Sequence, residues 1–144
     1  MIPWIIDASI TINWLLDDEQ DRQHSIAIFQ CIGERKISVP SLWVYEVANV
    51  LLVAHRRKRL TADKIQHFLK TLSELEPQLH APELGSASRL SKLALQHQLT
   101  VYDAAYLDLA LHTGFPIATI DAALIRAMKA AKVERAMPSA SPIQ

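Results

Sequence analysis

Short apolar runs alternate along this chain with longer stretches in which apolar side chains recur at helical spacing. The runs have the length of strands, and proline, glycine or charged residues bound them. Short apolar runs of this kind are typical of strands that are buried on both faces of a sheet. They predict four strands and leave Val133 as the start of a possible fifth; the four cover residues 2–6, 37–39, 78–81 and 117–120.

The stretches between these runs predict helices, several of which have recognisable start signals. Ser9, Ser41 and Thr61 each precede an apolar-periodic stretch and are expected to act as N-caps. Gly33 and Gly114 are expected to end the helices that precede them. The predicted helices cover about 10–16, 20–31, 42–58, 62–75, 86–97, 102–114 and 122–131.

Strands that alternate with helices favour an α/β fold in which helices cover both faces of a mostly parallel sheet of four to five strands. The chain has 144 residues, half of them apolar and 21% charged, which suits one domain with a sizeable core. We expect a single domain over residues 1–135 and a flexible C-terminal tail over residues 136–144, where prolines and serines gather.

The overall charge is balanced, since 15 basic residues face 15 acidic ones, so charge neither indicates nor excludes a nucleic-acid partner. Cys31 is the single cysteine and suits a reducing compartment. The N-terminus lacks the pattern of a signal peptide, and no apolar run has the length of a membrane span. We therefore expect a cytoplasmic protein with no membrane association. The histidines lack zinc-site spacing, and no glycine-rich phosphate loop is present.

Four acidic residues stand out by their positions. Asp7 and Asp121 each follow a predicted strand, and ligands of parallel sheets bind beyond the carboxyl ends of the strands. Glu46 lies in an otherwise apolar helix, one turn before Asn49, and Asp103 falls in the first turn of its helix. Each has a structural explanation when taken alone, because caps, turns and first helical turns favour acids. Glu46 is the hardest to explain in this way, since a carboxylate in an apolar helix is usually paired, neutralised or bound to a ligand.

If the four acids converge, each close pair repels by roughly 4 kcal/mol at ~4 Å and an effective dielectric of ~20. No Lys or Arg is adjacent to any of them in the sequence. A hard divalent cation would resolve this repulsion, because Mg²⁺ and Mn²⁺ prefer carboxylate and water oxygens. Such a site polarises a phosphodiester and activates water near neutral pH.

Four segments in the same order resemble those of the PIN-domain nucleases, and specifically the VapC-type toxins of type II toxin–antitoxin pairs. They are residues 5–9 (IIDAS), 45–51 (YEVANVL), 99–107 (LTVYDAAYL) and 111–124 (LHTGFPIATIDAAL). The resemblance implies a three-layer α/β/α fold and Mg²⁺- or Mn²⁺-dependent cleavage of RNA. It implies that Asp7, Glu46, Asp103 and Asp121 form a catalytic, metal-binding quartet. Ser9 and Thr119 match positions that often hold hydroxyl groups lining the pocket, and Asn49 is expected to support the site beside Glu46. The resemblance also implies a homodimer and a small VapB-like antitoxin that blocks the site.

Other assignments compete with this one. A phospho-accepting receiver domain needs a paired acid cluster after its first strand, whereas Asp7 is followed by Ala8 and Ser9. A phosphohydrolase of the Asp-x-Asp type fails for the same reason. A catalytically inactive PIN-like module that binds RNA or protein remains an alternative that sequence alone does not separate from an enzyme.

Two further features have more than one interpretation. The basic run 56–59 either contacts RNA phosphates or complements the negative end of a helix. Asp108, five residues beyond Asp103, is expected to point away from the other acids toward the surface.

Overall fold

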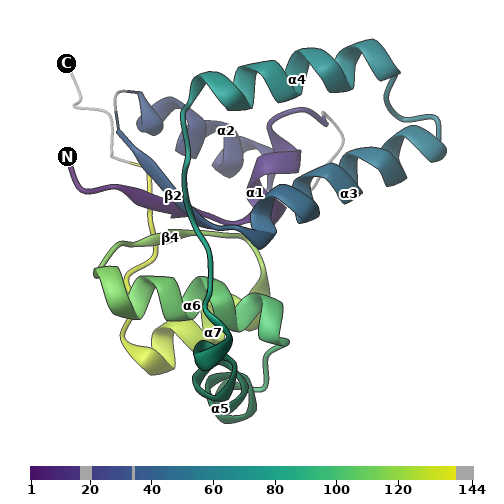
Figure 1. Ribbon diagram of the computed structural model, residues 1–144. Coiled ribbons are helices and arrows are strands. Elements are labelled where there is room, and N and C mark those ends of the chain that lie inside the picture. The colour runs from purple at the N-terminus through teal and green to yellow at the C-terminus, as the bar shows by residue number, and fades with distance from the viewer. Residues whose placement is uncertain (17–20, 34, 139–144) are drawn as a thin grey trace, which may run out of the picture.

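The computed structural model describes residues 1–16, 21–33 and 35–138, which form four strands, seven α-helices and one short 3₁₀-helix (Figure 1). In chain order these are β1 (Trp4–Ile6), α1 (Ala8–Asn13), α2 (Arg22–Ile32), β2 (Ile37–Pro40), α3 (Leu42–Arg56), α4 (Ala62–Glu74), β3 (Gln78–His80), η1 (Leu84–Ser86), α5 (Ala87–His97), α6 (Val101–Thr113), β4 (Ile117–Ala118) and α7 (Ala122–Ala131).

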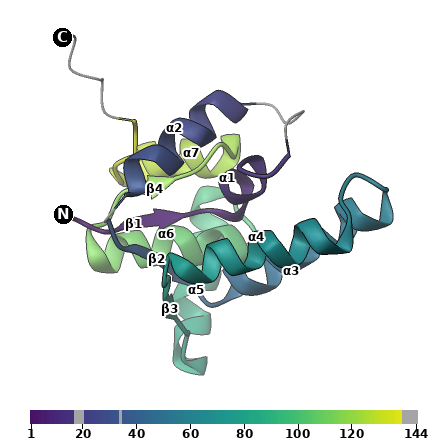
Figure 2. The same cartoon turned by 90° about the horizontal axis from the view of Figure 1, so that it is seen from above.

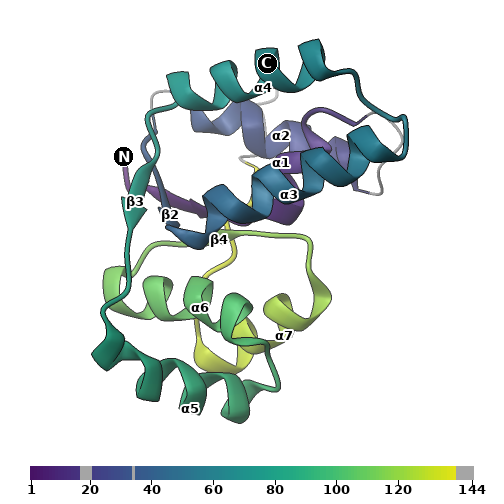
Figure 3. The same ribbon diagram turned by 45° about the vertical axis from the view of Figure 1, so that its right-hand side comes forward.

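The four strands form one parallel sheet in the order β3-β2-β1-β4. Helices α1 to α4 lie on one side of the sheet and α5 to α7 on the other, as Figures 1 and 3 show. The three-layer α/β/α architecture is therefore confirmed. The possible fifth strand is reduced to a single parallel bridge between Ile117 and Arg135 in the described part of the chain.

Burial on both faces explains why β1, β2 and β4 are mostly apolar, whereas the edge strand β3 is largely exposed. Ile5, Ile37 and Ile117, on three neighbouring strands, are all fully buried. Helix α6 contacts β1, β2 and β4, and it places Tyr106 and Leu107 in the core. The central strands thus have no solvated face, and polar groups reach water mainly where the strands end.

The three predicted N-caps have different outcomes. The Thr61 hydroxyl accepts a hydrogen bond from the Lys64 N–H at 3.2 Å, so its role as N-cap is confirmed. Ser41 occupies the N-cap position of α3, but its side chain forms no cap bond. An N-cap residue typically has extended backbone angles, whereas the φ of −57° and ψ of −27° of Ser41 are helical. The prediction for Ser9 was wrong. It lies inside α1, and Asp7 holds the N-cap position.

The ends of the chain bear on the domain limits. The Ala136 N–H donates to the Ile117 carbonyl at 2.8 Å, so the chain is still attached to the sheet at that point. Two predictions fall outside the described residues: most of the predicted tail, residues 139–144, and Gln20, the predicted start of the second helix.

None of the helices in the described ranges combines the length and apolar character that crossing a membrane requires.

Candidate active site

The site begins where β1 and β4 end side by side. The parallel register pairs Ile6 with Ala118, and the Asp7 N–H donates to the Ala118 carbonyl at 3.0 Å. The next residues on the two strands, Asp7 and Thr119, therefore lie next to each other although the sequence separates them widely. Asp7 is 4% exposed, which is rare for a carboxylate without a compensating partner.

Two hydroxyl groups hold the Asp7 carboxylate. Ser9 and Thr119 each donate to Asp7 Oδ2 at 2.7 Å. Thr119 Oγ1 also accepts from the Asp121 N–H at 3.0 Å, which fixes the turn between β4 and α7. Ser9 lines the acidic pocket, as expected, whereas Thr119 is fully buried and acts on the pocket through its hydrogen bond to Asp7.

Glu46, on α3, lines the same pocket as Asp7. The Tyr106 hydroxyl on α6 donates to Glu46 Oε1 at 2.7 Å, so one hydrogen bond ties α3 to α6. Asn49, one turn further along α3, also lines the pocket. The expected pairing of Glu46 and Asn49 on one helix face is thus present.

Asp103 and Asp121 both lie at helix N-termini. The Asp103 N–H donates to the Thr100 hydroxyl, which caps α6. Asp121 caps α7 by accepting from the Leu124 N–H through Oδ2 at 3.2 Å. The structural explanation that the sequence offered for each is therefore correct, yet both residues also line the pocket.

All four predicted acids line one open pocket of about 390 Å³, together with Ser9 and Asn49. None of the four forms an ion pair with Lys or Arg in the described part of the chain. Asp108 provides the contrast. It binds the Arg89 guanidinium through both oxygens, at 2.9 and 3.2 Å, and its side chain is 16% exposed. It points away from the acidic pocket, as expected, but it is paired and largely covered.

Burial is the largest cause of the raised pKa values of Asp7, Glu46 and Asp103. Burial raises the pKa of Asp7 above its ordinary value of 3.8; the bonds from Thr119 and Ser9 oppose this effect, and the charge of Asp121 adds to it. Burial also raises the pKa of Glu46, with the charges of Asp7 and Asp103 adding to the effect. For Asp103, burial and then the charges of Asp121 and Asp7 raise the pKa. The acids therefore act on one another electrostatically as a single group.

The chemistry of the donors suits a hard divalent cation, since carboxylates, one hydroxyl and one amide offer oxygen ligands, and no thiol or imidazole lines the pocket. Among the residues that the structure describes, however, no three His, Cys, Asp or Glu side chains are grouped tightly enough to enclose an ion as they lie. Binding a cation would require the carboxylates to move closer together than their mutual repulsion now favours.

Sequence reasoning missed two residues that shape the site. Tyr106 looked like an ordinary core residue of an apolar helix, although its position three residues after Asp103 places both on one side of α6. Arg135, from beyond α7, donates to the Thr119 carbonyl at 3.0 Å and so braces the turn that carries Thr119. No local sequence pattern pointed to Arg135, because its contact depends on the bridge to β4.

Comparison with known proteins assigns the chain to a family. The PIN domain family model matches residues 4–130, and the chain belongs to the PIN-domain family. It is 33% identical over 121 residues to ribonuclease VapC3 of Pyrobaculum aerophilum, with 81% of this chain and 88% of the relative covered.

Solved structures agree on the fold. PAE2754 of P. aerophilum superposes with a TM-score of 0.68 and 23% identity, covering 88% of this chain and 79% of that one. VapC20 of Mycobacterium tuberculosis, described as a sarcin–ricin-loop cleaving toxin, superposes with a TM-score of 0.67 and 9% identity, covering 94% and 99%. The suspected membership of the PIN family is thus confirmed.

We predict that Asp7→Asn stabilises the metal-free protein at neutral pH. The raised pKa means that the folded state holds this proton more tightly than the unfolded state. Stability is therefore lost as the pH rises from about the ordinary value of 3.8 to the higher folded value. The Asn oxygen can still accept from Ser9 and Thr119. In EDTA at pH 7, the variant should melt at a higher temperature than the wild type, by roughly 2–4 °C for each kcal/mol of added stability. This difference should vanish near pH 3. A gain that is equally large at pH 3 and pH 7 would contradict this cause.

We also predict that Tyr106→Phe weakens binding of a divalent cation by about 10- to 100-fold, because a residue that orients a ligand typically contributes this much. The variant keeps the ring in the core and removes only the hydroxyl that holds Glu46. Mn²⁺ titration followed by electron paramagnetic resonance measures the effect. Tyr45→Phe is the matched control, since that side chain is 78% exposed beside Glu46. Equal affinities for both variants would remove Tyr106 from this role.

Proposed function

We propose that this protein is a divalent-metal-dependent endoribonuclease that acts as the toxin of a toxin–antitoxin pair. The observation that carries the proposal is the meeting of four carboxylates, from four separate segments, in one pocket without a cationic partner in the described residues. Membership of the PIN family and the likeness to a protein named ribonuclease VapC3 support the same reading.

Asp7, Glu46, Asp103 and Asp121 would hold the cation. When bound, Mg²⁺ or Mn²⁺ would act as a Lewis acid toward a phosphodiester and lower the pKa of water. The chain's own contribution is to orient two of these carboxylates. Ser9 and Thr119 orient Asp7, and Tyr106 orients Glu46. An open pocket at the strand ends leaves room for an extended RNA strand to pass the carboxylates.

Asp121 differs from the other three because its side chain caps a helix: Oδ2 accepts from the Leu124 N–H at the start of α7. The cap ties this carboxylate to the helix end. We propose that it holds a second, weaker ion or completes the site from its edge.

We expect Asp7→Asn, Glu46→Gln and Asp103→Asn each to reduce RNA cleavage by on the order of 100-fold or more, since each removes charge that acts in the transition state. Asp121→Asn should reduce it less. The assay incubates the purified protein with total RNA and Mg²⁺. EDTA should stop cleavage and added Mn²⁺ should restore it.

Asp108→Asn is the matched control, because it removes a carboxylate on the same helix as Asp103 but outside the pocket. Cleavage that persists through chelation would contradict the metal mechanism. A folded wild-type protein that binds RNA and leaves it intact would favour the inactive PIN-like module.

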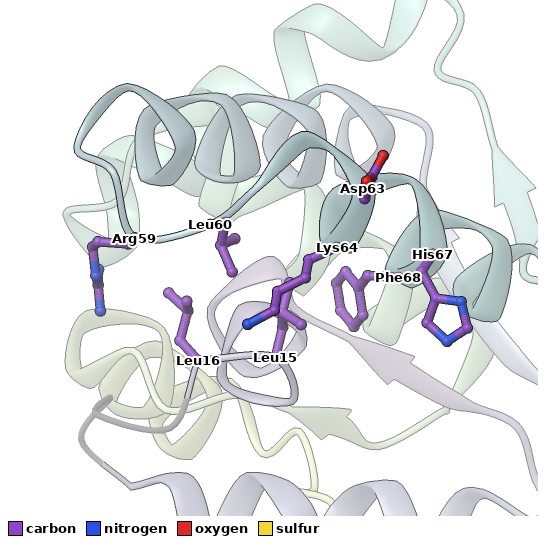
Figure 4. Close-up of a pocket in the computed structure, with 8 residues that line it drawn as sticks. All are labelled: Leu15, Leu16, Arg59, Leu60, Asp63, Lys64, His67 and Phe68. Carbon is purple, nitrogen blue, oxygen red and sulfur yellow. The ribbon is translucent and has the colours of Figure 1, made fainter.

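An antitoxin needs a docking surface, and one apolar hollow fits a partner segment. Figure 4 shows Leu16 and Leu60 facing each other across a pocket of about 690 Å³ between the end of α1 and α4. Leu15 and Phe68 continue its apolar wall, and Lys64 extends along the same wall. We propose that an amphipathic segment of a small antitoxin packs here, with its apolar side chains against these residues.

We predict that Leu15→Glu abolishes co-purification with the proposed VapB-like antitoxin, because a charge would be buried in the contact without a partner. Leu95→Glu on α5 is the control, since Leu95 is 81% exposed on the opposite side of the sheet. Melting temperatures check that both variants fold. Co-purification that survives in Leu15→Glu, or that is lost in Leu95→Glu, would remove this hollow as the docking site.

The homodimer stays a prediction. Tyr45 and Tyr102, each adjacent in sequence to a pocket acid, are exposed apolar side chains that suit such a contact.

A further inference from the structure

The acidic pocket continues into a groove along α3. Ile12 and Val50 line the acidic pocket. The same two residues line a second hollow of about 160 Å³, which extends past Val53 to Arg57. The two hollows therefore share part of their walls, and together they follow α3 from the carboxylates to its far end.

The helix itself connects the two ends of this groove. Positions 46, 50, 53 and 57 fall on one face of a helix, so Glu46 and Arg57 share a face with Val50 and Val53 between them. The distance along the axis is about 16 Å, because eleven residues each rise about 1.5 Å. Figure 2 shows the α3–α4 hairpin extending away from the sheet, with this end of α3 at its tip.

A third hollow, of about 660 Å³, surrounds the turn that follows α3. Its cationic lining comes from the end of α3, the turn and the start of α4: Arg56, Lys58, Arg59 and Lys64. It shares Arg59 with the second hollow. We use the name cationic turn for residues 56–59.

Hydrogen bonding at the helix end does not require these basic side chains. Backbone N–H groups of Arg57, Lys58 and Arg59 already bond the carbonyls of Val53, His55 and Ala54 at 2.9–3.0 Å. The basic side chains are therefore not needed to satisfy the last carbonyls of α3. In the ranges that the structure describes, the side chains of Arg56, Arg57 and Lys58 form no hydrogen bond and no ion pair.

We propose that the cationic turn is a phosphate-binding subsite for single-stranded RNA, joined to the acidic pocket by the groove along α3. This inference rests on the proposed function, since the RNA in question is the strand being cleaved. An acidic pocket repels a polyanion, and cations about 16 Å away would hold the strand while a phosphodiester enters. The apolar ledge of Ile12, Val50 and Val53 lies between them, where bases can contact apolar side chains.

The test measures binding of a labelled 12-nucleotide single-stranded RNA by fluorescence anisotropy at several salt concentrations, with Mg²⁺ and the Asp7→Asn change present to prevent cleavage. Each lost phosphate contact lowers the salt slope of log K by about 0.7 for a single strand. Adding Arg57→Gln and Lys58→Gln together should therefore lower the slope by about 1.4. In the otherwise wild-type enzyme, the same pair should raise KM and leave kcat unchanged, because the reacting groups are untouched.

Lys70→Gln with Lys92→Gln is the matched control, since both lysines are exposed helical residues outside the groove and the net charge changes equally. An unchanged slope in the Arg57 and Lys58 variant, or an equal change in the control, would overturn the subsite. The subsite would also be overturned if the Arg57 and Lys58 variant lost a co-purified protein partner while its RNA binding stayed unchanged. That result would assign the turn to the protein partner. If wild-type protein with Mg²⁺ cleaves no RNA while the slope still falls as expected, the proposed function fails and the phosphate-binding turn stands.

Discussion

The parallel pairing of β1 with β4 is the constraint on which the site depends. The register that pairs Ile6 with Ala118 makes Asp7 and Thr119 neighbours, and the Asp7 N–H bond to Ala118 locks that register. A slip by one residue would turn every side chain of the strand to the opposite face. Because β1 is buried on both sides, such a slip would also place a carboxylate in the core. The hydrophobic core and the position of the first acid are therefore fixed by the same pairing.

Electrostatics separates two kinds of acid in this molecule. Asp108 lies outside the pocket, and its charge is neutralised by an ion pair with Arg89. The pocket acids have hydroxyl and backbone donors, which orient a carboxylate without neutralising it. Hydrogen bonds can thus arrange charges that remain mutually repulsive, and the folded chain bears the resulting cost in free energy. A group of uncompensated, pre-oriented carboxylates is typical of sites that bind or process a ligand rather than of structural ion pairs.

The sequence predicted the layers, the strands and the four pocket acids because each leaves a local pattern. Apolar runs mark strands that are buried on both faces, and an acid directly after such a run marks the strand end. Ser9 was misread because a serine before an apolar stretch resembles an N-cap, whereas its hydroxyl bonds Asp7 instead. The contacts of Tyr106 and Arg135 could not be predicted, since they join residues from distant segments: the bond from Tyr106 to Glu46 spans 60 positions. Local pattern predicts elements and their ends, while contacts between elements depend on packing.

The bond between Thr119 and Asp7 spans 112 positions of the chain. Closing a contact with such wide sequence separation costs loop-closure entropy, which slows folding. During synthesis, Asp7 leaves the ribosome well before Thr119 and Asp121. A nascent chain therefore holds the Asp7 carboxylate without its Thr119 partner until the segment through Asp121 has been made.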